Sequence, residues 1–192
     1  MPIRRAVMIF AMTCMAHAPG QAETPAGKVL AEGITLDLGS EWTVRETVNS
    51  AMKSPMVQTL LDDAREYRLR KGDTGILISY MGFKTGPDAD PAAFDAVSIV
   101  KQGAGQYLPQ ARETEVAVQQ VTNGNVVATF TTLHARDGET FGVGIGYSGS
   151  CVTAGNLRHA DKLAIFAVSI SSRTCDDASH KEAVAAVLGA HD

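Results

Sequence analysis

Apolar and polar residues alternate in several short runs along the chain, and the first of these runs covers residues 33–38. Ile34, Leu36 and Leu38 are separated there by threonine and aspartate. Alternation with a period of two predicts a strand that buries one face. The turn that follows carries Trp42, the single tryptophan of the chain, and we expect this side chain to lie in the core.

Strand patterns of the same kind recur farther along the chain. Two runs at 67–70 and 76–81 flank a turn rich in glycine and aspartate, and they predict a hairpin. Asn123 and Gly124 favour a second tight hairpin, because both residues tolerate a positive φ. The rest of the pattern predicts a meander with a long loop before its last strand. Its predicted strands are 116–122, 126–134, 140–148 and 163–171.

Helical patterns interrupt these strands at three places. Ser54 and Pro55 can cap and begin a short helix over 55–64, and Asp90 can cap a longer one. Residues 179–182 spell Ser-His-Lys-Glu, a capping box that predicts a C-terminal helix. The order of elements predicts an α+β fold, with a mostly antiparallel sheet of about six to seven strands flanked by helices in an α/β/α sandwich.

The N-terminus predicts a secretory signal peptide. Two arginines precede an uncharged apolar run over residues 6–16, and small residues at positions 20 and 22 suit a cleavage site. This run of about eleven residues is too short for a membrane-spanning helix, which needs roughly 20. We therefore expect a protein of the periplasm or the exterior, with a removed signal at 1–22, a flexible lead at 23–32 and one α+β domain at 33–192.

Charge narrows the classes of partner. Lysine and arginine number 17 against 21 aspartate and glutamate, and two of the arginines lie in the predicted signal, which leaves 15 basic residues and a net charge of −6. Such a chain repels phosphate backbones, so we expect no nucleic-acid partner. It has no second apolar run long enough for a membrane helix, so we expect no stable membrane insertion after signal removal.

Several segments together resemble the PsbP-like and DcrB-like α/β/α sandwich proteins. They are the opener G-I-T-L-D-L-G-S-E-W, the extended hairpin, the helix introduced by D-P-A-A-F-D-A-V, and the last strand that leads into a C-terminal helix. The resemblance covers most of the predicted mature chain. It implies a small envelope or lumenal accessory protein that binds other proteins, and it implies no catalytic residues.

The stretch F-G-V-G-I-G-Y-S-G-S-C contains a formal G-x-G-x-x-G match at Gly144, Gly146 and Gly149. A nucleotide-binding loop needs these glycines between a strand and a helix. Here the glycines alternate with valine, isoleucine and tyrosine, as in a strand, so we expect no nucleotide cofactor. Gly142, Gly144, Gly146 and Ser148 would instead leave one sheet face bare, which admits a helix or forms a ligand or partner surface.

Ser148, His159 and Asp161 offer a hydrolase alternative. A nucleophile elbow requires G-x-S-x-G, and residue 150 is serine where the motif needs glycine. A catalytic triad is defined by geometry rather than by spacing. We therefore expect no catalytic residues, and the distance between Ser148 and His159 decides the matter.

Cys151 and Cys175 would remain after signal removal, and an even number of cysteines in an oxidising compartment predicts a disulfide. The predicted topology argues against this bond. If strands 140–148 and 163–171 form a simple hairpin, the two cysteines lie at opposite ends of it, tens of ångströms apart. A disulfide needs Cα atoms within about 7 Å of each other. One of these two inferences must therefore be wrong.

The remaining pattern favours binding over catalysis. The five histidines lack H-x-H or H-x-x-x-H spacing, and the cysteines lack the close pairs of zinc sites, so we expect no metal. We expect a non-enzymatic exported protein that binds another envelope protein, as an accessory or immunity-type factor. The alternatives are a small-ligand or lipid carrier that uses the glycine-lined sheet face and, less favoured, a serine hydrolase.

Overall fold

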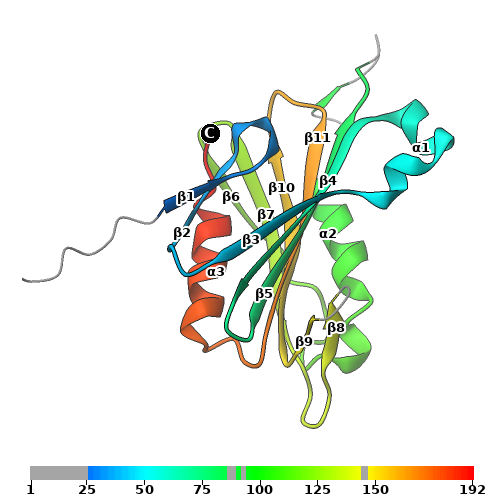
Figure 1. Ribbon diagram of the computed structural model, residues 1–192. Coiled ribbons are helices and arrows are strands. Elements are labelled where there is room, and N and C mark those ends of the chain that lie inside the picture. The colour runs from blue at the N-terminus through cyan, green and yellow to red at the C-terminus, as the bar shows by residue number, and fades with distance from the viewer. Residues whose placement is uncertain (1–25, 86–89, 92–93, 144–146) are drawn as a thin grey trace, which may run out of the picture.

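The computed structural model describes residues 26–85, 90–91, 94–143 and 147–192, so the expected signal peptide lies outside it. The described chain is built around a seven-stranded antiparallel sheet in the order β3-β4-β5-β11-β10-β7-β6 (Figure 1). The α+β class and the large antiparallel sheet are confirmed. The strands of this sheet are β3 (Thr43–Val48), β4 (Leu61–Lys71), β5 (Thr74–Phe83), β6 (Gln119–Asn123), β7 (Val126–His134), β10 (Cys151–His159) and β11 (Ala164–Ser172).

Different elements cover the two faces of this sheet. One face packs against α3 (Ala178–Leu188) and against a two-stranded ribbon of β1 (Ala26–Val29) and β2 (Thr35–Leu38). On the other face, α2 (Ala96–Gly105) packs against β7 and β10, beside Leu133. Figure 1 shows α2 and α3 on opposite sides of the sheet. Because successive side chains of a strand point to opposite faces, the central strands contribute to both cores.

The ribbon of β1 and β2 places the first predicted strand in the core. Ile34, Leu36 and Leu38 are fully buried, and Trp42 is 2% exposed, as expected. The prediction of a flexible lead at 23–32 is wrong where the structure describes it, because Ala26–Val29 pair with β2 as an antiparallel strand. A segment without an inward apolar pattern can still satisfy its backbone groups by pairing with a neighbouring strand.

The predicted long loop before residue 163 is also wrong. Residues 151–159 form β10, which lies between β7 and β11 near the middle of the sheet. Both faces of β10 are covered, so nearly all of its residues are buried and its sequence shows no alternation. Gly155 adds to the loop-like composition, but it serves close packing: a Cβ there would collide with the ring of Phe130 and the carbonyl oxygen of Thr129.

Replacement of Gly155 by alanine is expected to lower the free energy of unfolding by about 2 kcal/mol, because the added methyl group overpacks the strand. Urea unfolding of G155A and G103A tests this. Gly103 lies in α2 with open space around its Cβ direction, so G103A should be neutral or slightly stabilising. A loss below about 0.5 kcal/mol in G155A, the range of an ordinary surface substitution, would contradict the predicted collision.

The predicted strand 140–148 does not join the main sheet. Phe141–Val143 (β8) and Tyr147–Gly149 (β9) pair with each other in a separate two-stranded ribbon. Gly149 approaches the backbone of Ser172 so closely that a Cβ there would collide with it, which places β9 against the end of β11. Gly142 and Ser148, the described positions of the predicted bare face, therefore do not lie on the main sheet.

Both predicted hairpins exist, but the tight turn expected at Asn123 and Gly124 is shifted by one residue. The β4–β5 hairpin turns at Gly72, which has a positive φ. In the β6–β7 hairpin, Asn123 pairs with Val126, so Gly124 and Asn125 are the two turn residues. Gly124 has a φ of 57°, so the glycine supplies the positive φ that this turn needs.

The three predicted helices exist, with shifted boundaries. α1 (Pro55–Leu60) ends before residue 64, because Leu61 already begins β4 and pairs with β5. The predicted cap of α2 at Asp90 is wrong: α2 begins after Asp95, whose carboxylate accepts hydrogen bonds from the backbone N–H and hydroxyl of Ser98. Asp95 is the cap because its carboxylate stands three residues before the backbone N–H of Ser98, the usual spacing of a capping hydrogen bond.

The capping box predicted for α3 is wrong as well. The helix begins at Ala178, and Ser179 and Glu182 do not bond each other's backbone. The Ser179 hydroxyl lies 2.6 Å from that of Thr74, on β5. Glu182 accepts hydrogen bonds from Gly39, Trp42 and Lys71, which are distant in sequence. Both side chains of the motif therefore make tertiary contacts instead of capping the helix.

Candidate functional site

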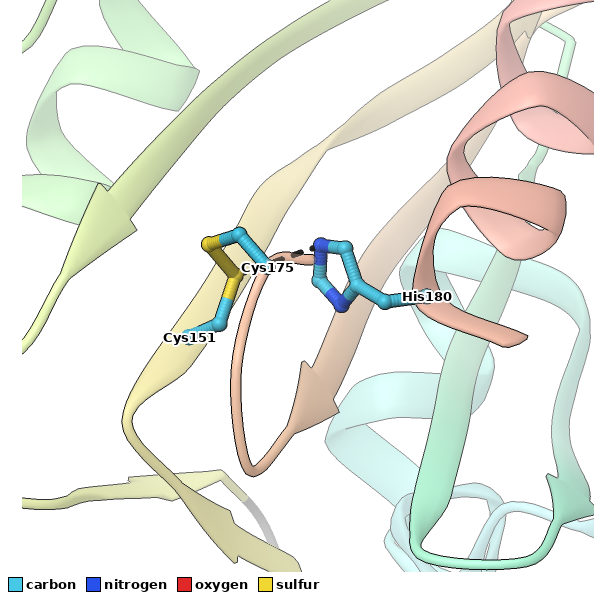
Figure 2. Close-up of side chains that lie close together, drawn as sticks. All are labelled: Cys151, Cys175 and His180. Atoms are coloured by element: carbon cyan, nitrogen blue, oxygen red, sulfur yellow. Dashed lines mark hydrogen bonds between the residues drawn. A yellow bond between two sulfur atoms is a disulfide. The ribbon is translucent and has the colours of Figure 1, made fainter. Parts of the chain in front are cut away.

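Cys151 and Cys175 form a disulfide at one end of the sheet (Figure 2). Their Cα atoms lie 5.2 Å apart, a usual separation for such a bond. The cysteines meet because β10 and β11 form a hairpin whose register pairs Cys151 with Ser172, shortly before Cys175. Of the two conflicting predictions, the disulfide is therefore confirmed, and the hairpin between 140–148 and 163–171 is wrong.

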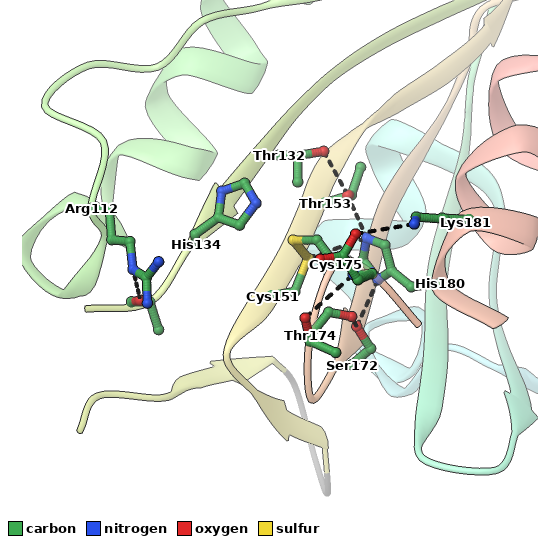
Figure 3. Close-up of a disulfide and its surroundings, with 12 residues drawn as sticks. Arg112, Thr132, His134, Cys151, Thr153, Ser172, Thr174, Cys175, His180 and Lys181 are labelled. Carbon is green, nitrogen blue, oxygen red and sulfur yellow. Dashed lines mark hydrogen bonds and ion pairs between the residues drawn. A yellow bond between two sulfur atoms is a disulfide. The ribbon is translucent and has the colours of Figure 1, made fainter. Parts of the chain in front are cut away.

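His180, on the first turn of α3, lies against this disulfide and is 2% exposed. Its Nε2 is 3.3 Å from Sγ of Cys151 and 3.1 Å from Oγ1 of Thr153. Its Nδ1 is 2.9 Å from Oγ of Ser172 (Figure 3). Strands β10 and β11 and helix α3 thus bring a sulfur, two hydroxyls and an imidazole together.

The hydrogen bonds around His180 fix which ring nitrogen carries the proton. Ser172 donates its only hydroxyl proton to the carbonyl oxygen of Thr174, 2.8 Å away, so it can only accept from Nδ1 of His180. Nδ1 is therefore protonated. Nε2 in turn presents its lone pair toward the hydroxyl of Thr153 and the sulfur of Cys151.

Burial lowers the pKa of His180, because desolvation penalises the imidazolium form. The carboxylate of Asp177 acts in the opposite direction, and the nearby His134 lowers the pKa further. His180 is therefore a neutral imidazole at neutral pH. Such a group can accept a proton from a thiol or bind a metal ion through its unprotonated nitrogen.

Two hollows border Cys175, which is half-buried, whereas Cys151 is fully buried. The larger, about 320 Å³, lies between α3 and β7 and is lined by Thr132, His180, Lys181 and the apolar side of α3. The smaller, about 210 Å³, is lined by polar groups that include Arg112, His134, Arg173 and Asp176. Cys175 is therefore the half of the disulfide that solvent can approach.

A second histidine, His134, lies directly across from Cys151, where β7 pairs with β10. Its Nδ1 is 2.7 Å from Oε1 of Glu113, and the backbone N–H of His134 donates to Oε2. Burial raises the pKa of Glu113, but these hydrogen bonds outweigh it and hold the pKa below its ordinary value. Glu113 therefore stays ionised and orients the partly exposed ring of His134.

Of the four residues in the surface predicted from the glycine pattern, the structure describes two, and both lie outside the main sheet. Gly142 on β8 and Ser148 on β9 are exposed, and Gly144 and Gly146 lie outside the described residues. No helix in the described part of the chain packs over Gly142, whose Cβ direction is open. At Gly142, a described position of this pattern, there is therefore no close approach of a helix.

The hydrolase alternative fails on distance. β9 lies at the end of the sheet where β10 begins with Cys151, and His159 ends β10 at the other side. Eight strand residues span about 26 Å at the usual rise of a strand, far beyond hydrogen-bond reach of Ser148. His159 is instead 3.3 Å from Oδ2 of Asp192. Ser148 and His159 therefore cannot act as a nucleophile and its base.

The outer edge of β3 is a second feature of functional interest. All but one of its residues are exposed, and no strand of the described chain pairs with its outer side. Val48 at its end is 75% exposed, and Met56 and Leu60 on the following helix α1 are 76% and 59% exposed. An unpaired edge strand that carries exposed apolar side chains can pair with another chain.

The comparisons with known proteins give no relatives. No family model, no curated protein and no solved structure matches this chain. Within the part of the chain that the structure describes, none of the helices combines the length and apolar character needed to cross a membrane.

Sequence reasoning identified the cysteines of the site but missed His180, Thr153 and Ser172. His180 stands inside the Ser-His-Lys-Glu motif, which indicates local capping rather than a contact with a distant strand. Thr153 and Ser172 lie on β10 and β11, and the sequences of these two strands do not indicate how the strands pair. The set becomes visible only when β10, β11 and α3 are placed together.

Proposed function

We propose that the chain is an exported, non-enzymatic protein that binds another envelope protein, as an accessory or immunity-type factor. The signal pattern of residues 1–22 supports export, and the disulfide is compatible with an oxidising compartment. The α/β/α sandwich arrangement and the likeness to PsbP-like and DcrB-like proteins belong to the same proposal. The observation that carries it is the exposed edge strand β3.

The register of β3 identifies the backbone groups that are free to bind. The N–H of Asn49 donates to Ala64 of β4, so residues 43, 45 and 47 also face β4. Val44, Glu46 and Val48 therefore point their N–H and C=O groups outward. An extended segment of a partner can add to this edge through main-chain hydrogen bonds.

The surroundings of β3 favour it over β6, the other edge strand. β6 carries one large apolar side chain, Val121, which is 36% exposed, whereas Val44 and Val48 are 44% and 75% exposed. The chain leaving β3 passes through a short 3₁₀ helix (Ser50–Lys53) to α1, which exposes Met56 and Leu60. A partner at β3 would therefore gain apolar burial as well as main-chain hydrogen bonds.

Proline at both outward valines (V44P/V48P) is expected to reduce partner capture by about tenfold or more, because it removes two outward N–H donors. Proline is tolerated where a strand N–H faces solvent, so the sheet should remain folded. The measurement places a photo-crosslinking residue at position 46 in two proteins, the native sequence and V44P/V48P. Cross-linked peptides from periplasmic extract are identified by mass spectrometry.

Matched variants separate edge pairing from general damage. V44T/V48T keeps the donors and should lose far less capture than V44P/V48P, because it removes only part of the apolar surface. T122P places proline on an outward position of β6 and should retain capture. Equal capture by the V44P/V48P protein would overturn the proposal. So would cross-linking only to a second copy of this chain, which would make β3 a self-association edge.

A further inference from the structure

We propose that Cys151, Cys175 and His180 form a binding site for one thiophilic metal ion, which becomes available when the disulfide is reduced. The potential ligand atoms, two Sγ atoms and a histidine nitrogen, all lie within 4.8 Å of one another. This inference rests on the cluster at the end of β10. It is independent of edge strand β3 and of the proposed partner.

The distances in the cluster suit a metal once the sulfurs separate. Zinc–sulfur bonds of about 2.3 Å and zinc–nitrogen bonds of about 2.0 Å in a tetrahedron place neighbouring ligand atoms roughly 3.5–3.8 Å apart. Nε2 of His180 is already 3.3 Å from Sγ of Cys151. The two sulfurs must move apart by less than about 2 Å. Cys175 is half-buried and follows the end of β11, so it can make that movement.

The surroundings of His180 are those of a metal ligand. A ligating histidine usually donates its other N–H to a fixed acceptor, which sets the tautomer and aims the free nitrogen. Here Nδ1 donates to Ser172, which is itself held by the carbonyl of Thr174. The lone pair on Nε2 thereby faces Cys151 and the hydroxyl of Thr153, and a metal ion bound there would replace that hydroxyl as its partner.

The chemistry balances with an external reductant. A small dithiol transfers two electrons and two protons to the disulfide, which gives the thiols of Cys151 and Cys175 and leaves the dithiol as its own disulfide. A divalent ion then displaces two thiol protons and binds both thiolates and Nε2 of His180. Thiolate and imidazole ligands select zinc or copper(I) over magnesium or calcium. Solvent can approach Cys175 from both hollows.

The test titrates the protein with cobalt(II) and then with zinc(II), after reduction by a water-soluble phosphine. Cobalt bound by thiolates gives a charge-transfer absorption, and zinc should abolish it at one ion per chain. The oxidised protein and the C151A/C175A protein should show no such absorption. H180Q should lower zinc affinity by about 100-fold, and S172A by about tenfold, because the serine only orients the ring.

H134Q is the matched control, since His134 lies across from Cys151 and belongs to no cluster of three ligand atoms. It should bind zinc as the native sequence does. Near-ultraviolet circular dichroism shows whether the reduced chain is folded, and a reduced chain that zinc refolds also supports the site. A folded reduced chain without cobalt absorption overturns the proposal. Binding that survives H180Q, or that H134Q abolishes, overturns the proposed ligand set.

Discussion

Replacing both cysteines by alanine (C151A/C175A) is expected to lower the free energy of unfolding by about 3.5 kcal/mol, the loop-closure value for a separation of this length. The cysteines are 24 residues apart in sequence, and their bond ties the start of β10 to the loop between β11 and α3. The native packing changes little, because the effect acts mainly through the greater freedom of the unfolded chain.

Denaturant unfolding followed by the fluorescence of Trp42 measures this change, since the single tryptophan lies in the core under α3. The reduced native sequence is the control, and it should lose nearly the same free energy as C151A/C175A. The disulfide would not be a significant restraint if both forms unfold within about 1 kcal/mol of the oxidised protein.

Replacing Glu182 by alanine is expected to cost about 3 kcal/mol, because one carboxylate satisfies several donors. Its Oε1 accepts from the indole N–H of Trp42 at 3.0 Å and from the backbone N–H of Gly39 at 3.1 Å. Its Oε2 accepts from Lys71 at 2.7 Å. Alanine would leave the buried indole N–H of Trp42 without a partner, whereas Lys71 would keep its ion pair with Glu41.

The same carboxylate makes stability depend on pH. Burial raises the pKa of Glu182, but hydrogen bonds from Lys71, Gly39 and Trp42 outweigh it and hold the pKa below its ordinary value. A lowered folded-state pKa stabilises the fold above the unfolded-state pKa. This contribution is lost as the pH falls from about 4.5 through the folded-state value.

Unfolding free energies of E182A, E182Q and the native sequence between pH 7 and pH 3 test both statements. E182Q keeps an acceptor for Trp42, so it should cost less than E182A at pH 7. The difference between the native sequence and E182Q should shrink as the pH falls. A difference that stays constant over this range would show that ionised Glu182 does not contribute.

Local pattern determined much of this protein directly from its sequence. The alternation of Ile34, Leu36 and Leu38 marks a strand with one buried face, and these side chains are fully buried. Gly124 marks a tight hairpin, because glycine readily adopts the positive φ that the turn needs, although the turn residues are Gly124 and Asn125 rather than Asn123 and Gly124. The disulfide also followed from an even count of two cysteines beyond the predicted signal. The strand and the turn depend on residues that are close in sequence, and the disulfide depends on the covalent chemistry of cysteine.

Only the tertiary structure decided which elements bring Cys151 and Cys175 together and which side chains surround their disulfide. β10 is covered on both faces, so its sequence carries no alternation, and its register with β11 resolves the conflict over Cys151 and Cys175. His180 and Glu182 belong to a motif for local capping, yet they bond to β10, β11 and the turn at Gly39. Long-range packing outweighed local preference there, because a buried imidazole and a buried indole each needed a partner that their neighbours in sequence do not supply.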